Sequence, residues 1–261
     1  MKYGFIGLGN MGGAIVRGVV ESGALAGNEF FAYDRHPDKL GKYPVVPCSG
    51  AAECARGADT VVLAVKPQAL DALFDELEGA LVPGKLAVSV AAGIPLSRYE
   101  SRFPGVAFVR AMPNLNAAVR RSVTAVCGGS CASAEQLALV KRLLECVGEV
   151  FEIPEKLFGA FSAVGCASPA YAFMFADALA SAGVKAGLPR ASALRIAVNS
   201  VLGSMETLRE SGVHPMELAD RVCSPGGTTI EGLHRLRADG FESAVYDAIA
   251  AVIAKDSSLG G

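Results

Sequence analysis

The sequence has few charged residues and no run of basic ones. Its 261 residues include 24 Lys and Arg and 26 Asp and Glu, so 19% are charged and the net charge is −2, against about 25% charged in typical soluble domains. A near-neutral chain without a basic stretch lacks the feature that attracts nucleic acid or an anionic membrane surface. We therefore expect a small-molecule ligand, and neither nucleic acid nor a membrane as a partner.

Metal and disulfide patterns are also missing. The seven cysteines are scattered without a CxxC pair, which is typical of reduced thiols in a cytosolic protein. The three histidines, His36, His214 and His234, lie too far apart in sequence to form a ligand motif, so we predict no metal. Because Met1-Lys2-Tyr3 runs directly into a glycine-rich turn without room for a signal peptide, we expect a cytoplasmic location.

Strand and helix patterns alternate in the first part of the chain. Short apolar and β-branched runs predict strands at residues 3–6, 30–33, 60–65, 86–90, 106–110, 123–127 and 150–153. Helical spacing of apolar residues predicts helices at 11–22, 68–81 and 137–147, the last preceded by a capping-box spacing from Ser133 to Gln136. The alternation predicts an α/β, Rossmann-type domain with a parallel sheet and helices on both faces.

After about residue 155 the strand signals stop and helical patterns continue to the end. We therefore predict one α/β domain over residues 1–155 and an all-helical domain over 156–261. Residues 157–176 carry no formal charge and approach the length of a membrane span. Pro169 within them and Asp177 directly after them favour a buried, interrupted helix pair that needs a partner surface.

A G-x-G-x-x-G motif directly follows the first predicted strand and opens a helix. In this setting glycines allow a tight turn and close approach of the backbone to a pyrophosphate, which the free N–H groups of the helix face. A glycine-rich turn without a ligand is the alternative. The motif predicts a dinucleotide-binding domain whose phosphate turn is formed by Gly7, Leu8, Gly9, Asn10, Met11 and Gly12.

The end of the second strand is ambiguous about the type of dinucleotide. Asp34 stands where a carboxylate would accept hydrogen bonds from both ribose hydroxyls, which favours NAD. The adjacent Arg35, with Lys39 nearby, would instead grip the 2′-phosphate of NADP. Asp34 and Arg35 as simple turn-capping and solvated residues are the third alternative.

Small or polar residues follow three further strands. Ligands of an open parallel sheet bind beyond the carboxyl ends of its strands, and small residues there leave space for a flat ring. This position predicts further cofactor contacts at Ala64, Val65, Lys66, Pro67, Ala91, Ala92, Met112, Pro113 and Asn114. Lys66 as an ordinary surface charge is the alternative.

A second anion-binding turn is predicted in the helical half, at residues 223–229. Its glycines suit a backbone nest, Thr228 and Glu231 have capping-box spacing, and hydroxyl groups stand at the positive end of a helix dipole. A plain helix connection is the alternative. Since no G-x-S-x-G, HExxH or P-loop lysine motif appears, the residues suit hydride transfer to an already protonated imine, which needs mainly orientation.

Together these motifs resemble the Δ1-pyrroline-5-carboxylate reductases, over essentially the whole chain. The matching pieces are residues 5–12, 64–67, 110–114, 168–171, 187–190 and 224–229. The first occurs in many dehydrogenases, whereas Ser224-Pro225-Gly226-Gly227-Thr228-Thr229 is close to diagnostic of this family.

The resemblance implies reduction of the cyclic imine L-1-pyrroline-5-carboxylate to L-proline with NAD(P)H, the hydride going to C5. It implies a catalytic Thr229 near the ring nitrogen, and a substrate carboxylate held by Val222, Ser224, Gly226, Gly227, Thr228 and Thr229. The family's helical domain forms an intertwined homodimer whose active site combines the dinucleotide domain of one chain with helices of the other, and larger rings of dimers occur.

The chain departs from the family pattern at two places. Cys166 and Ser168 add a Cβ at the two outer positions of the usual Gly-Ser-Gly-Pro-Ala-Tyr, and Asp34 is unexpected in a family that commonly prefers NADPH. We predict NADP(H) with Arg35 as the phosphate contact, NAD(H) being the alternative.

Two other functions fit parts of the sequence. A β-hydroxyacid dehydrogenase usually carries a catalytic lysine on an interdomain helix, whereas Lys185, the only lysine between residues 157 and 254, lies at a predicted helix end. A non-catalytic NAD(P)-binding protein would have no need of the second anion-binding turn.

Overall fold

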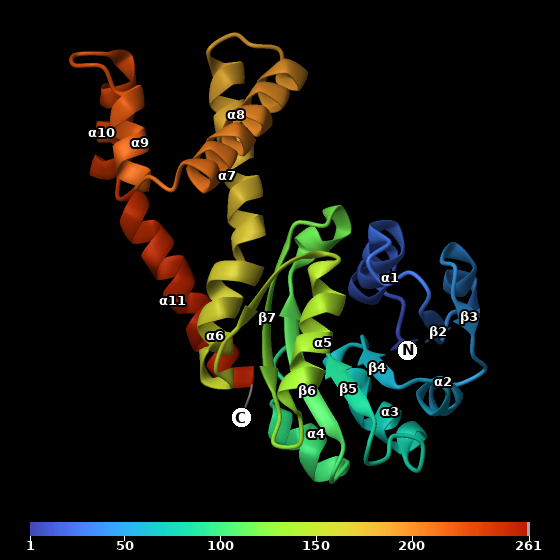
Figure 1. Cartoon of the computed structure of the whole chain (residues 1–261). Helices are drawn as coiled ribbons and strands as arrows, with labels where there is room; N and C mark the ends of the chain where they lie inside the picture. The colour runs from blue at the N-terminus through green and yellow to red at the C-terminus, as the bar shows by residue number, and fades with distance from the viewer. Residues whose placement is uncertain (260–261) are drawn as a thin grey trace. The chain divides into compact units, whose positions relative to one another are not determined.

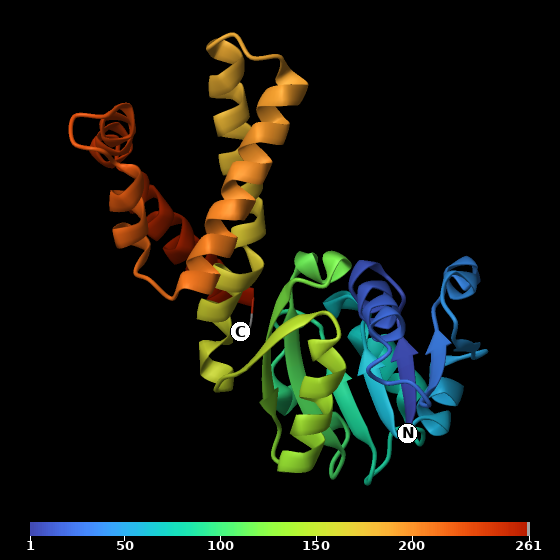
Figure 2. The ribbon, with the colours of Figure 1, turned by 45° about the horizontal axis from the view of Figure 1, so that its top comes forward.

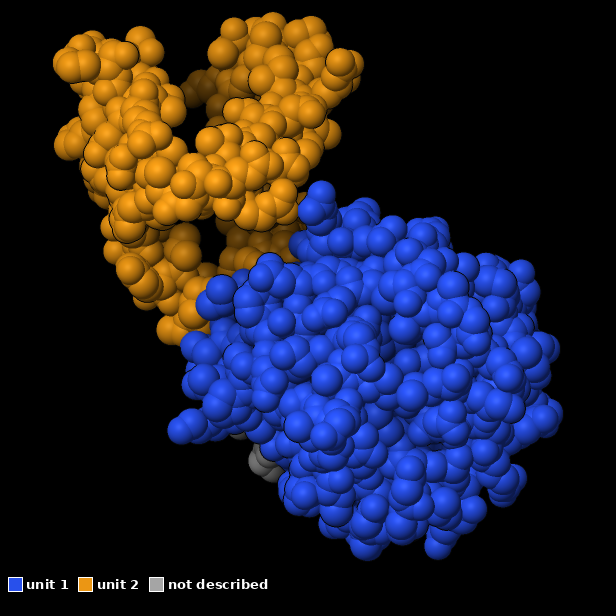
Figure 3. All heavy atoms as spheres, in the orientation of Figure 1, with its two compact units in different colours: residues 1–166, 252–261 blue, residues 167–251 orange. Residues whose placement is uncertain are grey.

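The computed structural model describes residues 1–259 (Figure 1). The chain divides into two compact units, residues 1–166 together with the segment from Val252 onward, and residues 167–251 (Figure 3). The strands end before residue 155, whereas the compact units divide at Cys166. As a division between two functional domains, the boundary after residue 155 stays a prediction.

All eight strands lie in one sheet, in the order β3-β2-β1-β4-β5-β6-β7-β8. They are β1 (Lys2–Ile6), β2 (Glu29–Tyr33), β3 (Val46–Pro47), β4 (Thr60–Leu63), β5 (Leu86–Ser89), β6 (Ala107–Pro113), β7 (Ser122–Gly128) and β8 (Gly148–Glu152). From β1 the chain moves outward to β2 and β3 and then returns to β4 on the other side of β1. Ligands of such sheets bind outside the carboxyl ends of the strands where the order reverses, which here is at β1 and β4.

Helices cover both faces of this sheet (Figures 1 and 2). They are α1 (Asn10–Ser22), α2 (Ala51–Gly57), α3 (Leu70–Leu77), α4 (Leu96–Arg102), α5 (Ala134–Glu145), α6 (Phe158–Phe161), the 3₁₀ helices η1 (Pro37–Lys42), η2 (Pro67–Ala69), η3 (Leu115–Val119) and η4 (Glu155–Leu157), and the π-helical turn η5 (Ser162–Cys166). The predicted Rossmann-type α/β domain followed by a helical region is confirmed.

The alternation of side chains along each strand gives the sheet two apolar cores. Val62 and Val88 pack with the buried faces of α1 and α5, whereas Val61 and Leu63 pack with those of α2, α3 and α4. All four side chains are fully buried, and burying each contributes about 1.5–3 kcal/mol relative to exposure. Both faces therefore hold the strands rigidly beneath the ligand cleft.

The sheet is not wholly parallel, which corrects the sequence prediction. β6 and β7 pair antiparallel, with Met112 opposite Ala125. Only residues 114–121 connect them, whereas a parallel crossover needs about a dozen or more residues. Arg120 adopts the left-handed conformation, with φ of 58°, and turns the chain back. As a result, η3 packs beside α1.

The predicted helices are confirmed in type but not at every end. The expected helix at 68–81 is wrong at both ends, because Pro67 opens the 3₁₀ helix η2 before α3, and α3 stops at Leu77, just before the left-handed Gly79. The capping box of α5 is confirmed. Ser133 Oγ accepts the N–H of Gln136 at 3.2 Å, and Gln136 Oε1 accepts that of Ser133 at 2.9 Å.

The helical unit contains α7 (Ser168–Lys185), α8 (Arg190–Ser211), α9 (Pro215–Val222), α10 (Thr228–Ala238) and most of α11 (Phe241–Leu259). α7 and α8 lie side by side as a helical hairpin (Figures 1 and 2). Gly187, with φ of 101°, allows the tight turn between them. The small residues Ala180, Ala193 and Ala197 are buried in this hairpin.

The segment 157–176 is interrupted as predicted, by η5 between α6 and α7. In the single chain Phe173 is 60% exposed and Met174 is 73% exposed, so the burial of this segment against a partner surface stays a prediction. Among the described residues, one helical stretch, Glu155–Lys185, is long and apolar enough to cross a membrane by length and composition alone, and 22% of its most apolar window is buried. Within the helical unit, exposed apolar side chains occur on α7 and also on α8, where Ile196 is 57% exposed and Leu202 is 54% exposed.

Candidate functional site

The predicted phosphate turn is built by close backbone packing. Gly7 has φ of 99°, and a Cβ added to it would lie 2.6 Å from the carbonyl oxygen of Ala64. A Cβ on Gly12 would overlap the carbonyl oxygen of Gly7, whereas no heavy atom lies within 4 Å of a Cβ placed on Gly9. The first and last glycines therefore let strand, turn and helix touch, and the middle one leaves open space above the turn.

The helix that follows presents an uncapped N-terminus to this space. Gly9 is the N-cap residue of α1, no side chain caps it, and the first turn of the helix has no acidic residue. Backbone N–H groups at the start of a helix have no partner within the helix and carry partial positive charge. The turn thus offers donors and positive potential to an anion such as a pyrophosphate.

Asp34, directly after β2, is buried and its carboxylate is fully engaged. Oδ2 accepts the N–H of Leu8 at 2.6 Å, Oδ1 accepts that of His36 at 2.9 Å, and Lys39 Nζ lies 3.1 and 3.3 Å from the two oxygens. Burial raises the pKa of this carboxyl, but the two backbone hydrogen bonds and the Lys39 ammonium outweigh burial and hold the pKa below its usual 3.8. Asp34 is therefore a fixed anion within the structure of the turn.

A cavity of about 270 Å³ opens at the carboxyl ends of β1, β2 and β4. Arg35 and Lys66 line it, together with Ala64 and Val65. The Arg35 side chain is 58% exposed and lies 3.7 Å from the carboxylate of Glu76 on α3, a weak pairing at this exposure. The guanidinium is therefore accessible to a ligand, and its contact with a 2′-phosphate stays a prediction.

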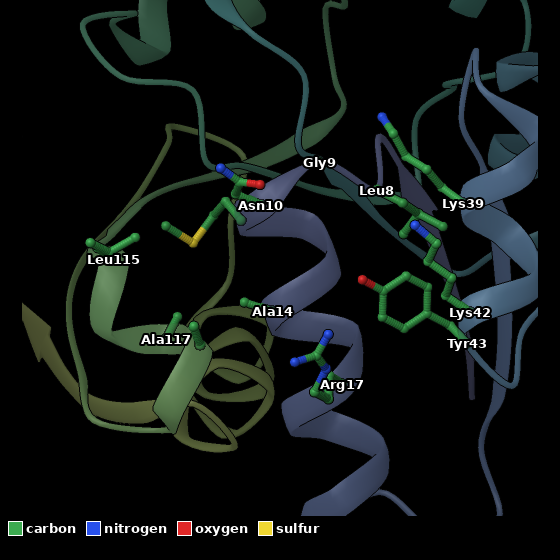
Figure 4. A pocket seen from close by; sticks show the side chains of 12 residues that line it. Leu8, Gly9, Asn10, Ala14, Arg17, Lys39, Lys42, Tyr43, Leu115 and Ala117 are labelled. Atoms are coloured by element: carbon green, nitrogen blue, oxygen red, sulfur yellow. The ribbon is translucent and has the colours of Figure 1, made fainter.

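A larger cavity, of about 550 Å³, lies on the other side of the turn (Figure 4). Asn10, Ala14 and Arg17 of α1 form one wall, and Lys42 and Tyr43 face them from η1 and its end (Figure 4). The η3 helix lies on the other side of α1 (Figure 4). Its residues Leu115, Ala117 and Ala118 complete the lining. Sequence reasoning predicted Asn10 as a cofactor contact but missed the other wall residues, although the helical spacing of Asn10, Ala14 and Arg17 indicates one face of α1.

The predicted cofactor contacts at the ends of the strands differ in exposure, and only some of them line a cavity. Lys66 is exposed and Pro67 begins η2. Ala91 is buried, and Ala92 is exposed. Among the described residues, neither alanine lines the two cavities beside the glycine turn. Ser89 Oγ accepts the N–H of Ala91 at 3.3 Å and so fixes the turn after β5.

Met112, Pro113 and Asn114 are likewise buried at the end of β6 and do not line either cavity. Asn114 Nδ2 donates to the carbonyl oxygen of Gly165 in η5 at 2.7 Å, and its Oδ1 accepts the N–H of Asn116 at 3.1 Å. The Asn114 side chain is thereby committed to joining β6, η3 and η5. Direct contact of these three residues with a cofactor stays a prediction.

The turn predicted to bind a second anion lies in the helical unit, between α9 and α10. Gly226 has φ of 66°, and the N–H of Gly227 donates to the carbonyl oxygen of Ser224 at 2.9 Å. Ser224, Thr228 and Thr229 are exposed, as is Val222 at the end of α9. The hydroxyl groups of Ser224, Thr228 and Thr229 are therefore accessible to a ligand.

The predicted capping box at Thr228 and Glu231 is wrong. Gly227 is the N-cap of α10, and it makes no side-chain capping bond, so Thr228 occupies the first helical position. The shift by one residue leaves the hydroxyls of Thr228 and Thr229 and the N–H groups of the first helical turn open. A carboxylate placed there gains roughly 0.3–2 kcal/mol from the helix dipole.

Comparison with known proteins extends over both units. Residues 155–259 match the family model described as pyrroline-5-carboxylate reductase dimerisation, and residues 2–93 match that of NADP oxidoreductase coenzyme F420-dependent. The pyrroline-5-carboxylate reductase of Escherichia coli (strain K12) is 38% identical over 263 residues, covering 99% of this chain and 98% of the relative.

Solved structures agree with the sequence comparison. A pyrroline-5-carboxylate reductase from Coxiella burnetii superposes with a TM-score of 0.93 at 29% identity, covering 100% of this chain and 98% of the other. The Plasmodium falciparum pyrroline carboxylate reductase with NADP bound gives 0.87 at 27% identity, with coverage of 100% and 98%. On the identity and coverage shared with the curated relatives, this chain belongs to the pyrroline-5-carboxylate reductase family.

Proposed function

We propose that this chain reduces L-1-pyrroline-5-carboxylate to L-proline with NADPH, the last step of proline synthesis. Family membership over the full length carries the assignment. The structure supports it with two uncapped helix N-termini, one after Gly9 and one after Gly227, each suited to an anionic group. A dinucleotide phosphate and a substrate carboxylate are the two anions that the reaction brings together.

The glycine turn fits the dinucleotide. Gly7, Leu8, Gly9, Asn10, Met11 and Gly12 bind the pyrophosphate through the open backbone of α1, which the uncovered space above Gly9 accommodates. Arg35 binds the 2′-phosphate of NADP through its planar fork of donors. Ala64, Val65, Lys66, Pro67, Ala91, Ala92, Met112, Pro113 and Asn114 form or support the rest of the cleft. NADH is the alternative reductant.

The turn before α10 fits the substrate carboxylate. Ser224 and Thr228 donate hydrogen bonds to it, and Val222, Gly226 and Gly227 shape the turn around it. Thr229 hydrogen-bonds the ring nitrogen or relays its proton. When bound, the reduced nicotinamide supplies the hydride that is added to C5 of the imine. The chain's own contribution is to hold an iminium that is already electrophilic, so orientation is the main requirement.

A homodimer through the helical unit is part of the proposal. The exposed apolar side chains of α7 and α8 include Phe173, Met174, Ile196 and Leu202, each more than half exposed. Scattered exposed apolar residues are normal on a monomer, but large apolar surfaces usually mark an interaction site, which supports an interface here. A second copy accounts for this surface without a membrane. The proposal also includes larger rings of dimers. It further includes a cytoplasmic location, which the seven unpaired thiols suit.

One assay tests the function. Purified protein is given L-1-pyrroline-5-carboxylate with NADPH and, separately, with NADH, while loss of reduced nucleotide and formation of proline are followed. We expect proline in equal amount to the nucleotide oxidised. The proposal fails if no proline forms, and oxidation of a 2- or 3-hydroxy acid under the same conditions would identify a hydroxyacid dehydrogenase instead.

A further inference from the structure

The acidic residue at the end of β2 has a different task from the one its position suggests. A carboxylate there usually accepts hydrogen bonds from the ribose of a dinucleotide. We propose that Asp34 is instead a positioning residue, which fastens the glycine turn to the start of η1 and does not bind the ribose. This inference rests on the proposed function, since it concerns a dinucleotide in this cleft.

The hydrogen-bond capacity of Asp34 is already used. An ionised carboxylate has two oxygens with about four acceptor positions. The N–H groups of Leu8 and His36 take one position on each oxygen, and Lys39 Nζ lies within hydrogen-bond distance of both. Two ribose hydroxyls would have to displace these donors, and a buried backbone N–H that loses its partner is costly.

Burial points to the same conclusion. The Asp34 side chain is 7% exposed, whereas its neighbour Arg35 is 58% exposed. Asp34 is among the residues that line the cavity at the ends of β1, β2 and β4, but a residue that reads ribose must present a free oxygen to the ligand. Here the shortest of the carboxylate's bonds, 2.6 Å, runs back to Leu8, inside the phosphate turn and 26 residues away in sequence. Asp34 therefore determines where the Leu8 backbone lies.

The same contacts explain how an acid can stand beside a phosphate site. An uncompensated carboxylate would repel a 2′-phosphate, but the Lys39 ammonium neutralises this one. Asp38, also in this turn, is exposed and has no contact of this kind among those described. The negative charge of Asp34 is thus balanced within the turn, and Arg35 remains as the cation that faces outward.

The test compares Asp34→Asn with Asp38→Asn, which removes the same charge from the same turn. We expect Asp34→Asn to raise KM for NADPH and for NADH by a similar factor, about tenfold, because the turn that holds both nucleotides is loosened. In the protein without nucleotide, the peptide that contains Leu8 should exchange its amide hydrogens faster. Asp38→Asn should match the wild type in both measurements.

A rise in KM confined to NADH, or wild-type exchange of the Leu8 peptide in Asp34→Asn, would overturn the proposal. Should Asp34→Asn not fold, Lys39→Met keeps the two backbone hydrogen bonds and removes only the compensation. It should raise KM for NADPH and leave that for NADH unchanged, whereas a fall in KM for NADH would show that the freed oxygens reach the ribose. Hydrogen exchange needs no turnover, so its outcome stands even if wild-type protein fails to form proline.

Discussion

The carbonyl oxygen of Gly7 occupies the space that a side chain on Gly12 would need. The end of β1 and the first turn of α1 are therefore in direct backbone contact. Gly9, between these two residues, has no such neighbour and an ordinary φ of −69°. One motif thus contains a glycine required by packing, Gly12, and another, Gly9, that the packing of the chain does not require.

Replacing Gly12 by Ala should destabilise the protein. Alanine is the better helix former by about 1 kcal/mol, but overlap with backbone cannot be relieved by a rotamer change, and such overpacking costs typically about 1–3 kcal/mol or more. We expect a lower free energy of unfolding in urea, measured without nucleotide.

Gly9→Ala is the matched control for that experiment. Its methyl group meets open space in the folded chain, so the urea midpoint should stay at or above the wild-type value. The same methyl stands where the pyrophosphate approaches, so KM for NADPH should rise at least about tenfold. Equal destabilisation by the two substitutions would contradict the packing argument.

Arg35 should discriminate between the two nucleotides. Arg35→Ala removes the exposed guanidinium and should raise KM for NADPH about tenfold, with KM for NADH nearly unchanged. Glu76→Gln removes the carboxylate that lies 3.7 Å from this guanidinium and should lower KM for NADPH by up to about threefold, within the range of an exposed ion pair. A parallel response of both nucleotides to Arg35→Ala would show that the 2′-phosphate binds elsewhere.

Thr229 should affect turnover rather than nucleotide binding. Thr229→Val keeps the shape and removes the hydroxyl, and we expect kcat to fall about 10²–10⁴-fold, the usual contribution of a positioned proton-transfer group. The dissociation constant of NADPH, measured by fluorescence, should change little. Thr207→Val, on the exposed face of α8, should leave both quantities at wild-type values, and an active Thr229→Val would remove this residue from the chemistry.

Asp34 should make stability depend on pH in the acid range. Its pKa is lowered in the folded protein, so the carboxylate contributes stability that is complete above its usual pKa of 3.8 and is lost as pH falls through that value toward the folded pKa. The stability difference between wild type and Asp34→Asn should thus be constant from about pH 7 to pH 5 and shrink below about pH 4. Urea unfolding across this range measures it, and a difference that persists unchanged at about pH 3 would speak against a lowered pKa.

The exposed face of α7 should determine the oligomeric state. Met174→Glu places a charge on a side chain that is 73% exposed in the single chain, and it should shift the protein from dimer to monomer in light scattering. Val82→Asp, on an exposed position of the sheet domain, serves as the control and should remain dimeric. If Met174→Glu has the mass of the wild type at micromolar concentration, this face is not the interface.

Local signals in the sequence predicted most of the fold. The capping box at Ser133 and the apolar run at residues 60–65 were sufficient for α5 and β4, because both depend on near neighbours. The antiparallel step at β6 and β7 depends instead on the length of the connection and on Arg120 in a left-handed conformation, which is uncommon for a residue other than glycine. The predicted cap at Thr228 failed because Gly227 is the N-cap and Thr228 is already the first residue of the helix.

Sequence reasoning could identify candidate site residues where a motif is continuous in sequence, and it missed contacts that are assembled from distant segments. The glycine turn and Arg35 lie where the sequence placed them. The hydrogen bond from the Leu8 backbone to Asp34 joins parts of the chain that no local pattern connects. The same is true of the cavity walls that Tyr43 and Leu115 add beside α1.

The Asp34 to Leu8 bond has a consequence for attempts to change nucleotide preference by grafting. Transplanting residues 34–39 from a homologue without an acidic residue at position 34 would delete the acceptor of the Leu8 backbone N–H. A successful graft must therefore supply another acceptor for the Leu8 backbone N–H, or replace the glycine turn at residues 7–12 together with residues 34–39.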